Sequence, residues 1–182
     1  MDDRWEVRPD SDRPQWVVDP CLGVGPLRFG MNPDEVSAVL ADVTAEAQQC
    51  ITTHPRDGRQ AREVGQYRTS GLLLFYSRDE RLEGLAVDGL RGPQVHAEGV
   101  PLTGRVPSEV ERWMTARAAE RFPQDGFELG YLGTGVPCSW SLGLVVSVQR
   151  MADHLVTRPV IFTECVLDDP RHILPRQAWI IY

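Results

Sequence analysis

The first regular hydrophobic pattern in the chain has the period of a helix. Asn32 can cap free N–H groups, Pro33 has no N–H to lose in a first turn, and Glu35 completes a capping-box arrangement. One apolar helix face follows, formed by Val36, Val39, Leu40 and Val43. We predict a helix from Pro33 to about Ala47 and a turn-rich loop over residues 53–60.

Strand-like runs replace the helical pattern after residue 62. They are short, rich in aliphatic and aromatic residues and separated by turn residues, which is typical of antiparallel hairpins. The predicted strands cover residues 63–69, 72–77 and 82–89, and a further short segment covers 95–100. The first half of the chain is therefore expected to be a helix followed by an antiparallel meander.

The same order recurs in the second half. Pro107 opens a second predicted helix that ends near Arg121, and its apolar side is formed by Val110, Trp113, Met114 and Ala118. Two strong predicted strands, 139–149 and 159–167, follow this helix, and residues 150–158 connect them. The segment from Pro170 to the end is expected to be a strand or a packed tail.

The two helix starts resemble one another in sequence. Pro26-Leu27 matches Pro101-Leu102, Gly30 matches Gly104, Pro33 matches Pro107, and Glu35-Val36 matches Glu109-Val110. The interval is about 75 residues, and a period that long with two copies is typical of a tandem duplication rather than a solenoid. The two glycines are expected to make the turn before each helix, and the two prolines to occupy its first position.

These patterns predict an α+β protein of two tandem repeats, each a helix packed on a short antiparallel sheet. Residues 1–20 would form an N-terminal arm, in which Trp16–Val18 can add an edge strand. Residues 21–99 would form the first repeat and residues 100–182 the second, packed together as one globular unit.

Composition and charge narrow the classes of partner. The chain of 182 residues has a net charge of −7, and all 19 of its basic residues are arginine. It has no run of basic residues, which argues against nucleic acid and against an anionic membrane surface as binding partners. A basic protein partner is compatible with the charge. The charged start of the chain lacks the features of a secretory signal, so a cytoplasmic location is expected, and the oligomeric state is left open.

Candidate catalytic and metal-binding residues form no recognisable motif. Cys50 and His54 have the spacing of two metal ligands on a helix, but no second pair of ligands completes a site. His154, Cys165 and Asp168-Asp169 have the residue types of a nucleophilic triad, but nothing in the sequence brings them together. The glycines near residue 25 do not follow the dinucleotide-binding pattern. We therefore expect no catalytic residue, no metal and no cofactor.

The four cysteines are widely spaced, at positions 21, 50, 138 and 165. Reduced, mostly buried thiols are expected in a cytoplasmic chain, and two disulfides in an exported chain are the alternative.

Aromatic residues on or beside predicted strands are the most informative side chains. The candidate protein-binding residues are Phe75, Tyr76, Trp140, Phe162 and Trp179. A sheet with helices on one face turns alternate residues toward the other face, where several aromatics would make a binding surface. The alternative is that they fill two cores.

The helix-opening segment GPLRFGMNPDEV, with its echo after about 75 residues, resembles the beta-lactamase inhibitor protein and BamE-like group. It looks still closer to uncharacterised actinobacterial cytosolic proteins with GPLRFGM-like segments. The resemblance covers about residues 22–166. It implies a binding role through a concave sheet surface, without catalysis. The exported members have signal peptides and disulfides within each repeat, which this chain does not share, and no contact residue is carried over from them.

The expected function is thus a non-enzymatic protein-binding module, with an intracellular inhibitor or immunity-type protein as one concrete version. The alternative is a small-molecule-binding or enzymatic α+β domain with a site in the groove between the two halves. A structural protein whose repeat serves stability alone is a third reading.

Overall fold

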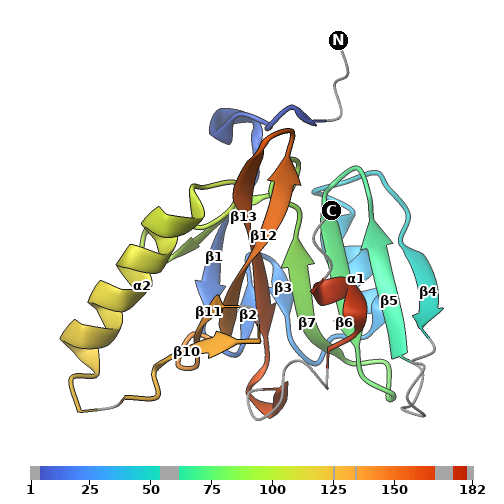
Figure 1. The fold of residues 1–182 in the computed structure, drawn as a ribbon. Coiled ribbons are helices and arrows are strands. Elements are labelled where there is room, and N and C mark those ends of the chain that lie inside the picture. The colour runs from blue at the N-terminus through green and yellow to red at the C-terminus, as the bar shows by residue number, and fades with distance from the viewer. Residues whose placement is uncertain (1–4, 54–61, 125, 134, 167–173, 180–182) are drawn as a thin grey trace.

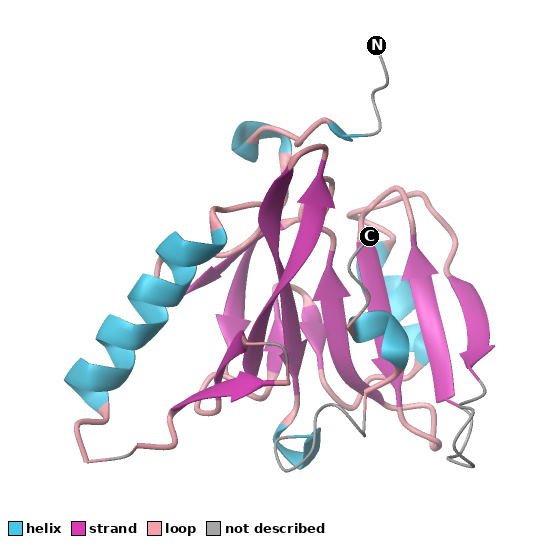
Figure 2. Ribbon diagram, viewed as in Figure 1, coloured by secondary structure: helices cyan, strands magenta, loops and turns pink. Residues whose placement is uncertain are grey.

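The computed structural model describes residues 5–53, 62–124, 126–133, 135–166 and 174–179. These residues form an α+β fold with two α-helices, a five-stranded mixed sheet and an eight-stranded antiparallel sheet (Figures 1 and 2). The α+β class is as the sequence predicts. The two halves are not clearly equal, because α1 has eight residues and α2 has fifteen.

The smaller sheet has the strand order β3-β2-β1-β8-β9. Its strands are β1 (Gln15–Asp19), β2 (Gly23–Val24), β3 (Leu27–Arg28), β8 (Gln94–Ala97) and β9 (Val100–Pro101). The expected edge strand at Trp16–Val18 is instead central: β1 pairs antiparallel with β2 and parallel with β8, with Trp16 opposite Val95. Trp16 and Val18 both point into the core, so this face of β1 packs against the larger sheet.

The larger sheet has the order β10-β11-β12-β13-β7-β6-β5-β4. Its strands are β4 (Gln49–Thr53), β5 (Arg62–Tyr67), β6 (Leu72–Tyr76), β7 (Leu82–Val87), β10 (Leu129–Leu132), β11 (Val136–Ser139), β12 (Leu144–Met151) and β13 (His154–Phe162). It consists of two four-stranded meanders joined where β7 pairs antiparallel with β13, with Ala86 opposite Val160. A single sheet thus runs through both halves of the chain.

The strand predictions are confirmed in the first meander but are wrong at several points between β11 and β13. The predicted strands 63–69, 72–77 and 82–89 are confirmed as β5, β6 and β7, with small differences at their ends. The predicted strand 139–149 is wrong as one element, because a turn at Gly143, with φ of +59°, divides it into β11 and β12. Residues 150–158 are not a loop: β12 and β13 extend through them to a tight turn at Ala152, with φ of +49°.

Both helices begin as their sequences indicate. Pro33 and Pro107 are the first residues of α1 (Pro33–Leu40) and α2 (Pro107–Arg121). Asn32 Oδ1 accepts from the Glu35 N–H at 2.9 Å, and Glu35 Oε2 accepts from the Asn32 N–H at 2.8 Å. Gly30 and Gly104 precede the helices with φ of +89° and +68°, a left-handed conformation that favours glycine.

The first helix is shorter than predicted, ending at Leu40 instead of near Ala47. Glu46 explains the difference, because its carboxylate accepts hydrogen bonds from the Thr69 and Ser70 N–H groups at 2.9 and 3.1 Å. This tertiary contact draws the chain away from the helix axis and toward β4, a strand that the sequence did not predict.

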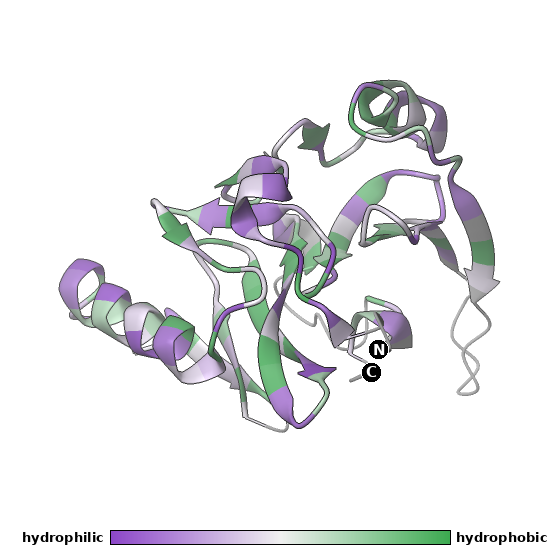
Figure 3. Cartoon of the chain, turned by 90° about the horizontal axis from the view of Figure 1, so that it is seen from above, coloured by the Kyte–Doolittle hydropathy of each residue, from purple (hydrophilic) through white to green (hydrophobic). Residues whose placement is uncertain are grey.

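Two hydrophobic cores lie on opposite faces of the larger sheet. The larger core packs β1–β3, β8 and both helices against one face, with Val36, Leu85 and Met114 among its members. The second core lies on the other face and contains no residue of the smaller sheet or of either α-helix. In Figure 3 hydrophobic residues concentrate along the central strands, whereas α2 carries many hydrophilic ones.

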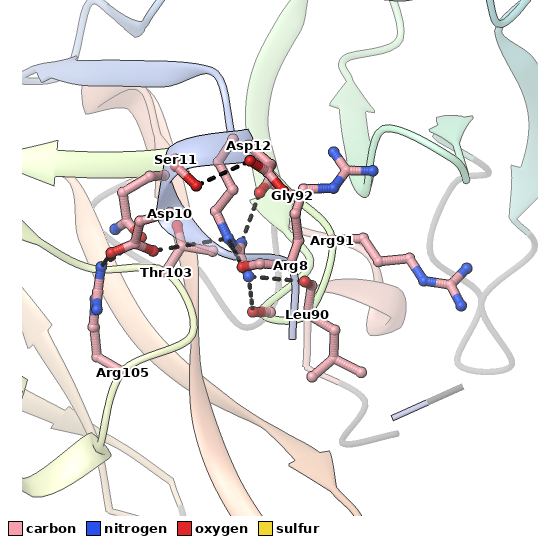
Figure 4. A network of polar contacts seen from close by, with 12 residues as sticks. Arg8, Asp10, Ser11, Asp12, Leu90, Arg91, Gly92, Thr103 and Arg105 are labelled. Carbon is pink, nitrogen blue, oxygen red and sulfur yellow. Dashed lines mark hydrogen bonds and ion pairs between the residues drawn. The ribbon is translucent and has the colours of Figure 1, made fainter. Parts of the chain in front are cut away.

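A buried arginine attaches the N-terminal arm to the body of the protein. Arg13 is 4% exposed, and it donates to the carbonyl oxygens of Arg8, Gly89, Leu90 and Gly92 at 2.7 to 3.1 Å. Asp10, in the 3-10 turn η2 (Asp10–Asp12), forms an ion pair with Arg105, whose guanidinium also donates to Gln94 (Figure 4). Burial lowers the pKa of Arg13 from its ordinary value.

Replacing Arg13 should therefore destabilise the whole protein. Arg13→Met removes a donor from four carbonyl oxygens, of which that of Leu90 keeps the Arg8 N–H, and we expect the free energy of unfolding in urea to fall by about 3 kcal/mol. The matched control is Arg91→Met, which removes the same charge from an exposed position on the loop that Arg13 holds. An equal loss of unfolding free energy in the two variants would contradict the conclusion that Arg13 attaches the N-terminal arm to the body of the protein.

Candidate functional site

The candidate site is the face of the larger sheet that is turned away from the helices, here named the outer face. In the view of Figure 1, α1 and the smaller sheet lie behind this sheet, and the C-terminal segment lies in front of β6 and β7. The buried residues of the outer face come from β5, β6, β7, β11, β12 and β13, and are Val64, Phe75, Ala86, Cys138, Val145, Val160 and Phe162. They form a continuous apolar surface across both meanders.

The C-terminal segment is the cover of this surface. It comprises residues 164–166, which form the 3-10 turn η3 (Glu164–Val166), and residues 174–179, which include η4 (Arg176–Ala178). Val166, Leu174 and Ala178 are buried in the same cluster as the sheet residues. Among the described residues, the outer face is therefore covered by short turns of chain and not by an α-helix.

Four of the five candidate aromatic residues meet on the outer face. Phe75 and Phe162 are fully buried there, and Trp140 and Trp179 are half-buried against the same cluster. Tyr76 lies in the other core, and its hydroxyl donates to Gln48 Oε1 at 2.9 Å. The aromatics are thus brought together on the face opposite the helices, but they are covered by the chain itself.

Arg158 is a member of the site that sequence reasoning missed. It is 2% exposed, and its guanidinium donates to the carbonyl oxygens of Ala178 at 2.9 Å and Gln177 at 3.3 Å. A signal for it exists in the sequence, because Arg158 alternates with Val156 and Val160 on one face of β13. A single arginine in such an apolar row indicates a buried partner.

The C-terminal segment fits the outer face imperfectly. Burying a side chain such as Leu174 contributes about 1.5–3 kcal/mol. Gln177 Oε1 and Trp179 Nε1, however, are buried without a hydrogen-bond partner among the described residues, and such an atom costs about 1–3 kcal/mol. The two unpaired atoms therefore offset part of the stabilisation that the segment gains by packing on the outer face.

A second buried polar cluster connects α2 to the sheets. Glu128 is 3% exposed, and its Oε1 accepts from Arg117 Nη1 and Ser139 Oγ at 2.6 Å and from Ser141 Oγ at 2.8 Å. Arg117 also pairs with Glu98, in the turn between β8 and β9, at 3.0 Å. Every member therefore bonds to another, and the closed cluster is suited to holding α2 in place.

The cysteines that the structure describes do not provide a reactive thiol. Burial is the main cause that raises the pKa of both Cys21 and Cys138, so each thiol is less ionised near neutral pH than a free one. Neither forms a disulfide. The side chains of Cys50 and Cys165, together with His54 and Asp168-Asp169, lie outside the described residues, so the sequence-based metal pair and triad cannot be assembled here.

Other surfaces of the described part of the chain carry little chemistry. An open groove of about 440 Å³ follows α2, and it is lined by Ser108, Glu111, Arg112, Thr115, Ala116 and Ala119. No group of three or more potential metal ligands occurs among the described residues. Within those same residues, no helix has the length and apolar character needed to cross a membrane.

Neutralising Glu128 should loosen α2 without affecting the outer face. Glu128→Gln leaves part of the buried Arg117 charge uncompensated, and we expect the free energy of unfolding in urea to fall by about 3 kcal/mol. The control is Glu120→Gln, at an exposed position on α2, which should change the free energy of unfolding by less than about 0.5 kcal/mol. Similar stability of the two variants would contradict a structural role for the cluster.

Comparison with known proteins adds no assignment to this geometry. No protein-family model, curated protein or solved structure matches the chain.

Proposed function

We propose that this protein is a non-enzymatic protein-binding module that acts by occlusion, with the outer face as its contact surface. The observation that carries the proposal is the apolar outer face itself, which spans six strands and is covered by short C-terminal turns. Contiguous apolar surface of this kind, lined with aromatic residues, is what protein interfaces use as anchors. An intracellular inhibitor or immunity-type protein is the concrete version that we favour.

The charge of the chain supports a basic partner. At a net charge of −7, complementary fields speed the encounter with a positively charged protein and disfavour acidic ones. The α2 groove gives no support to the small-molecule alternative, because the residues that line it belong to one helix and not to two facing halves.

We also propose that the fold arose by tandem duplication, as in the inhibitor-like group that the sequence resembles. What supports this is the order of elements: strands of the smaller sheet, a proline-initiated helix and a four-stranded meander occur twice. The last strands of the two meanders, β7 and β13, pair with one another. Unequal helices and the absence of a side-chain cap at Val106 would be later divergence.

Products of adjacent genes are the first partners to test, by co-expression and light scattering of the purified complex. Ile51 lies at the rim of the outer face, opposite Val64 in the β4–β5 register, and is 40% exposed. We expect Ile51→Arg to weaken a complex at least tenfold, because it places a charge on the rim that a basic partner would cover.

Leu155→Arg is the matched control for this substitution. Leu155 is equally apolar and 50% exposed on β13, but alternation along the strand places it on the opposite face from Val160. A complex sensitive to Leu155→Arg and insensitive to Ile51→Arg would refute the outer face as the contact surface. If the protein stays monomeric in the presence of every adjacent gene product, at low and at high salt, the binding function is refuted.

A further inference from the structure

Residues 174–179 of the C-terminal segment differ in charge from the rest of the chain. Residues 174–179 contain one arginine and no acidic residue, so the other 176 residues carry a net charge of −8 against −7 for the whole chain. Residues 174–179 are therefore a basic, aromatic-containing stretch that packs on an acidic protein. These are the properties expected of a partner for this chain.

Recognition at Arg158 depends on the main chain of the segment. The guanidinium donates to two consecutive carbonyl oxygens, those of Gln177 and Ala178. A planar fork of donors suits such a pair of acceptors. Any extended or turned peptide that presents two carbonyl groups at this point could take the same place.

Side chains next to these carbonyls supply the apolar contacts. Leu174 and Ala178 are buried among Phe75, Phe162 and the other outer-face residues, and Trp179 packs at the margin. A peptide ligand thus needs an aliphatic residue and an aromatic residue at about this spacing. Gln177 Oε1 and Trp179 Nε1 of the chain's own segment have no hydrogen-bond partner among the described residues, so the site leaves two polar atoms of its resident segment unsatisfied.

We infer that the outer face is a peptide-binding site for a basic, aromatic-bearing segment of a partner, and that residues 174–179 are its resident intramolecular ligand. The inference rests on the proposed binding function and names the chemistry of the partner at that same site. The partner gains access by displacing residues 174–179 from Arg158 and the apolar surface around it.

Tethering makes the resident ligand a competitor. A segment joined by a short linker acts at an effective concentration on the order of 1 mM, so even weak docking lowers the apparent affinity for an added peptide. Weakening the segment should consequently expose the site to peptides in solution.

The test uses the full-length protein and a fluorescein-labelled synthetic peptide of residues 174–182, LPRQAWIIY. Fluorescence anisotropy should show at least tenfold tighter peptide binding by Trp179→Ala protein than by wild type, because the variant loses its own aromatic anchor. Adding Arg158→Gln to that variant should remove the gain, with far-UV circular dichroism as the check of folding.

Peptide variants keep the test valid if the Arg158 variant fails to fold. Against Trp179→Ala protein, a peptide in which alanine replaces the tryptophan, and a scrambled peptide of equal composition, should each bind at least tenfold more weakly. Equal binding by wild type and Trp179→Ala protein would overturn the inference, as would equal binding of the scrambled peptide, which would indicate charge alone. A wild-type dimer formed by exchange of C-terminal segments would also overturn it, since the occupant would then be a second copy.

These outcomes are separable from failure of the proposed function. Suppose that Ile51→Arg weakens a complex with an adjacent gene product, but wild-type and Trp179→Ala protein bind the peptide equally. The proposed binding function would then stand, and the inference about residues 174–179 would be wrong.

Discussion

A wide antiparallel sheet that is apolar on both faces must be covered on both faces, and this requirement shapes the molecule. One face receives the smaller sheet and both α-helices, which bury Leu85, Val146 and Ile161 beneath them. The other face carries Phe75, Val145 and Phe162 and receives the C-terminal segment. Exposed, a surface of that extent would invite association. The asymmetry of its two covers is what distinguishes the outer face from an ordinary core.

Buried arginines attach the peripheral segments to the two sheets. Among the described residues there are three: Arg13 holds the N-terminal arm, Arg117 holds α2, and Arg158 holds the C-terminal segment. Arg13 and Arg158 use main-chain carbonyl groups, whereas Arg117 uses carboxylates. A chain without lysine has only the guanidinium for such roles, and its fixed fork of donors suits them. Of the three, Arg158 holds a segment that also leaves buried polar atoms unpaired.

Local signals in the sequence predicted the helix starts and most strands, because caps, prolines and alternation act over a few residues. The end of α1 could not be read locally, since Glu46 bonds to Thr69 and Ser70, which are distant in sequence. The central position of β1 was missed for the same reason: its parallel partner β8 is about 80 residues away. The long β12–β13 hairpin was hidden because its tip is polar and exposed while its base is apolar.

The site was predictable in part. Phe75 and Phe162 lie on the face without helices, whereas Tyr76, which was named with them, lies in the other core. A strand or packed tail was expected from Pro170, but nothing in the sequence indicated which face the end of the chain would cover. The alternation of Arg158 with Val156 and Val160 was a signal for a buried arginine, but its role depends on carbonyl groups that no sequence pattern identifies. The sequence therefore indicated which aromatic residues lie on or beside the strands, but not which face each one occupies or which distant segment covers that face.

Fluorine NMR tests the central claim most directly. The protein has five tryptophans, so full-length protein labelled with 5-fluorotryptophan should give a small set of resonances, with Trp179 assigned by Trp179→Phe. On titration with a partner or an excess of the unlabelled peptide, displacement of the C-terminal segment predicts that the Trp179 resonance moves toward its position in the free peptide. A partner that binds while the Trp179 resonance stays in place would contradict the account.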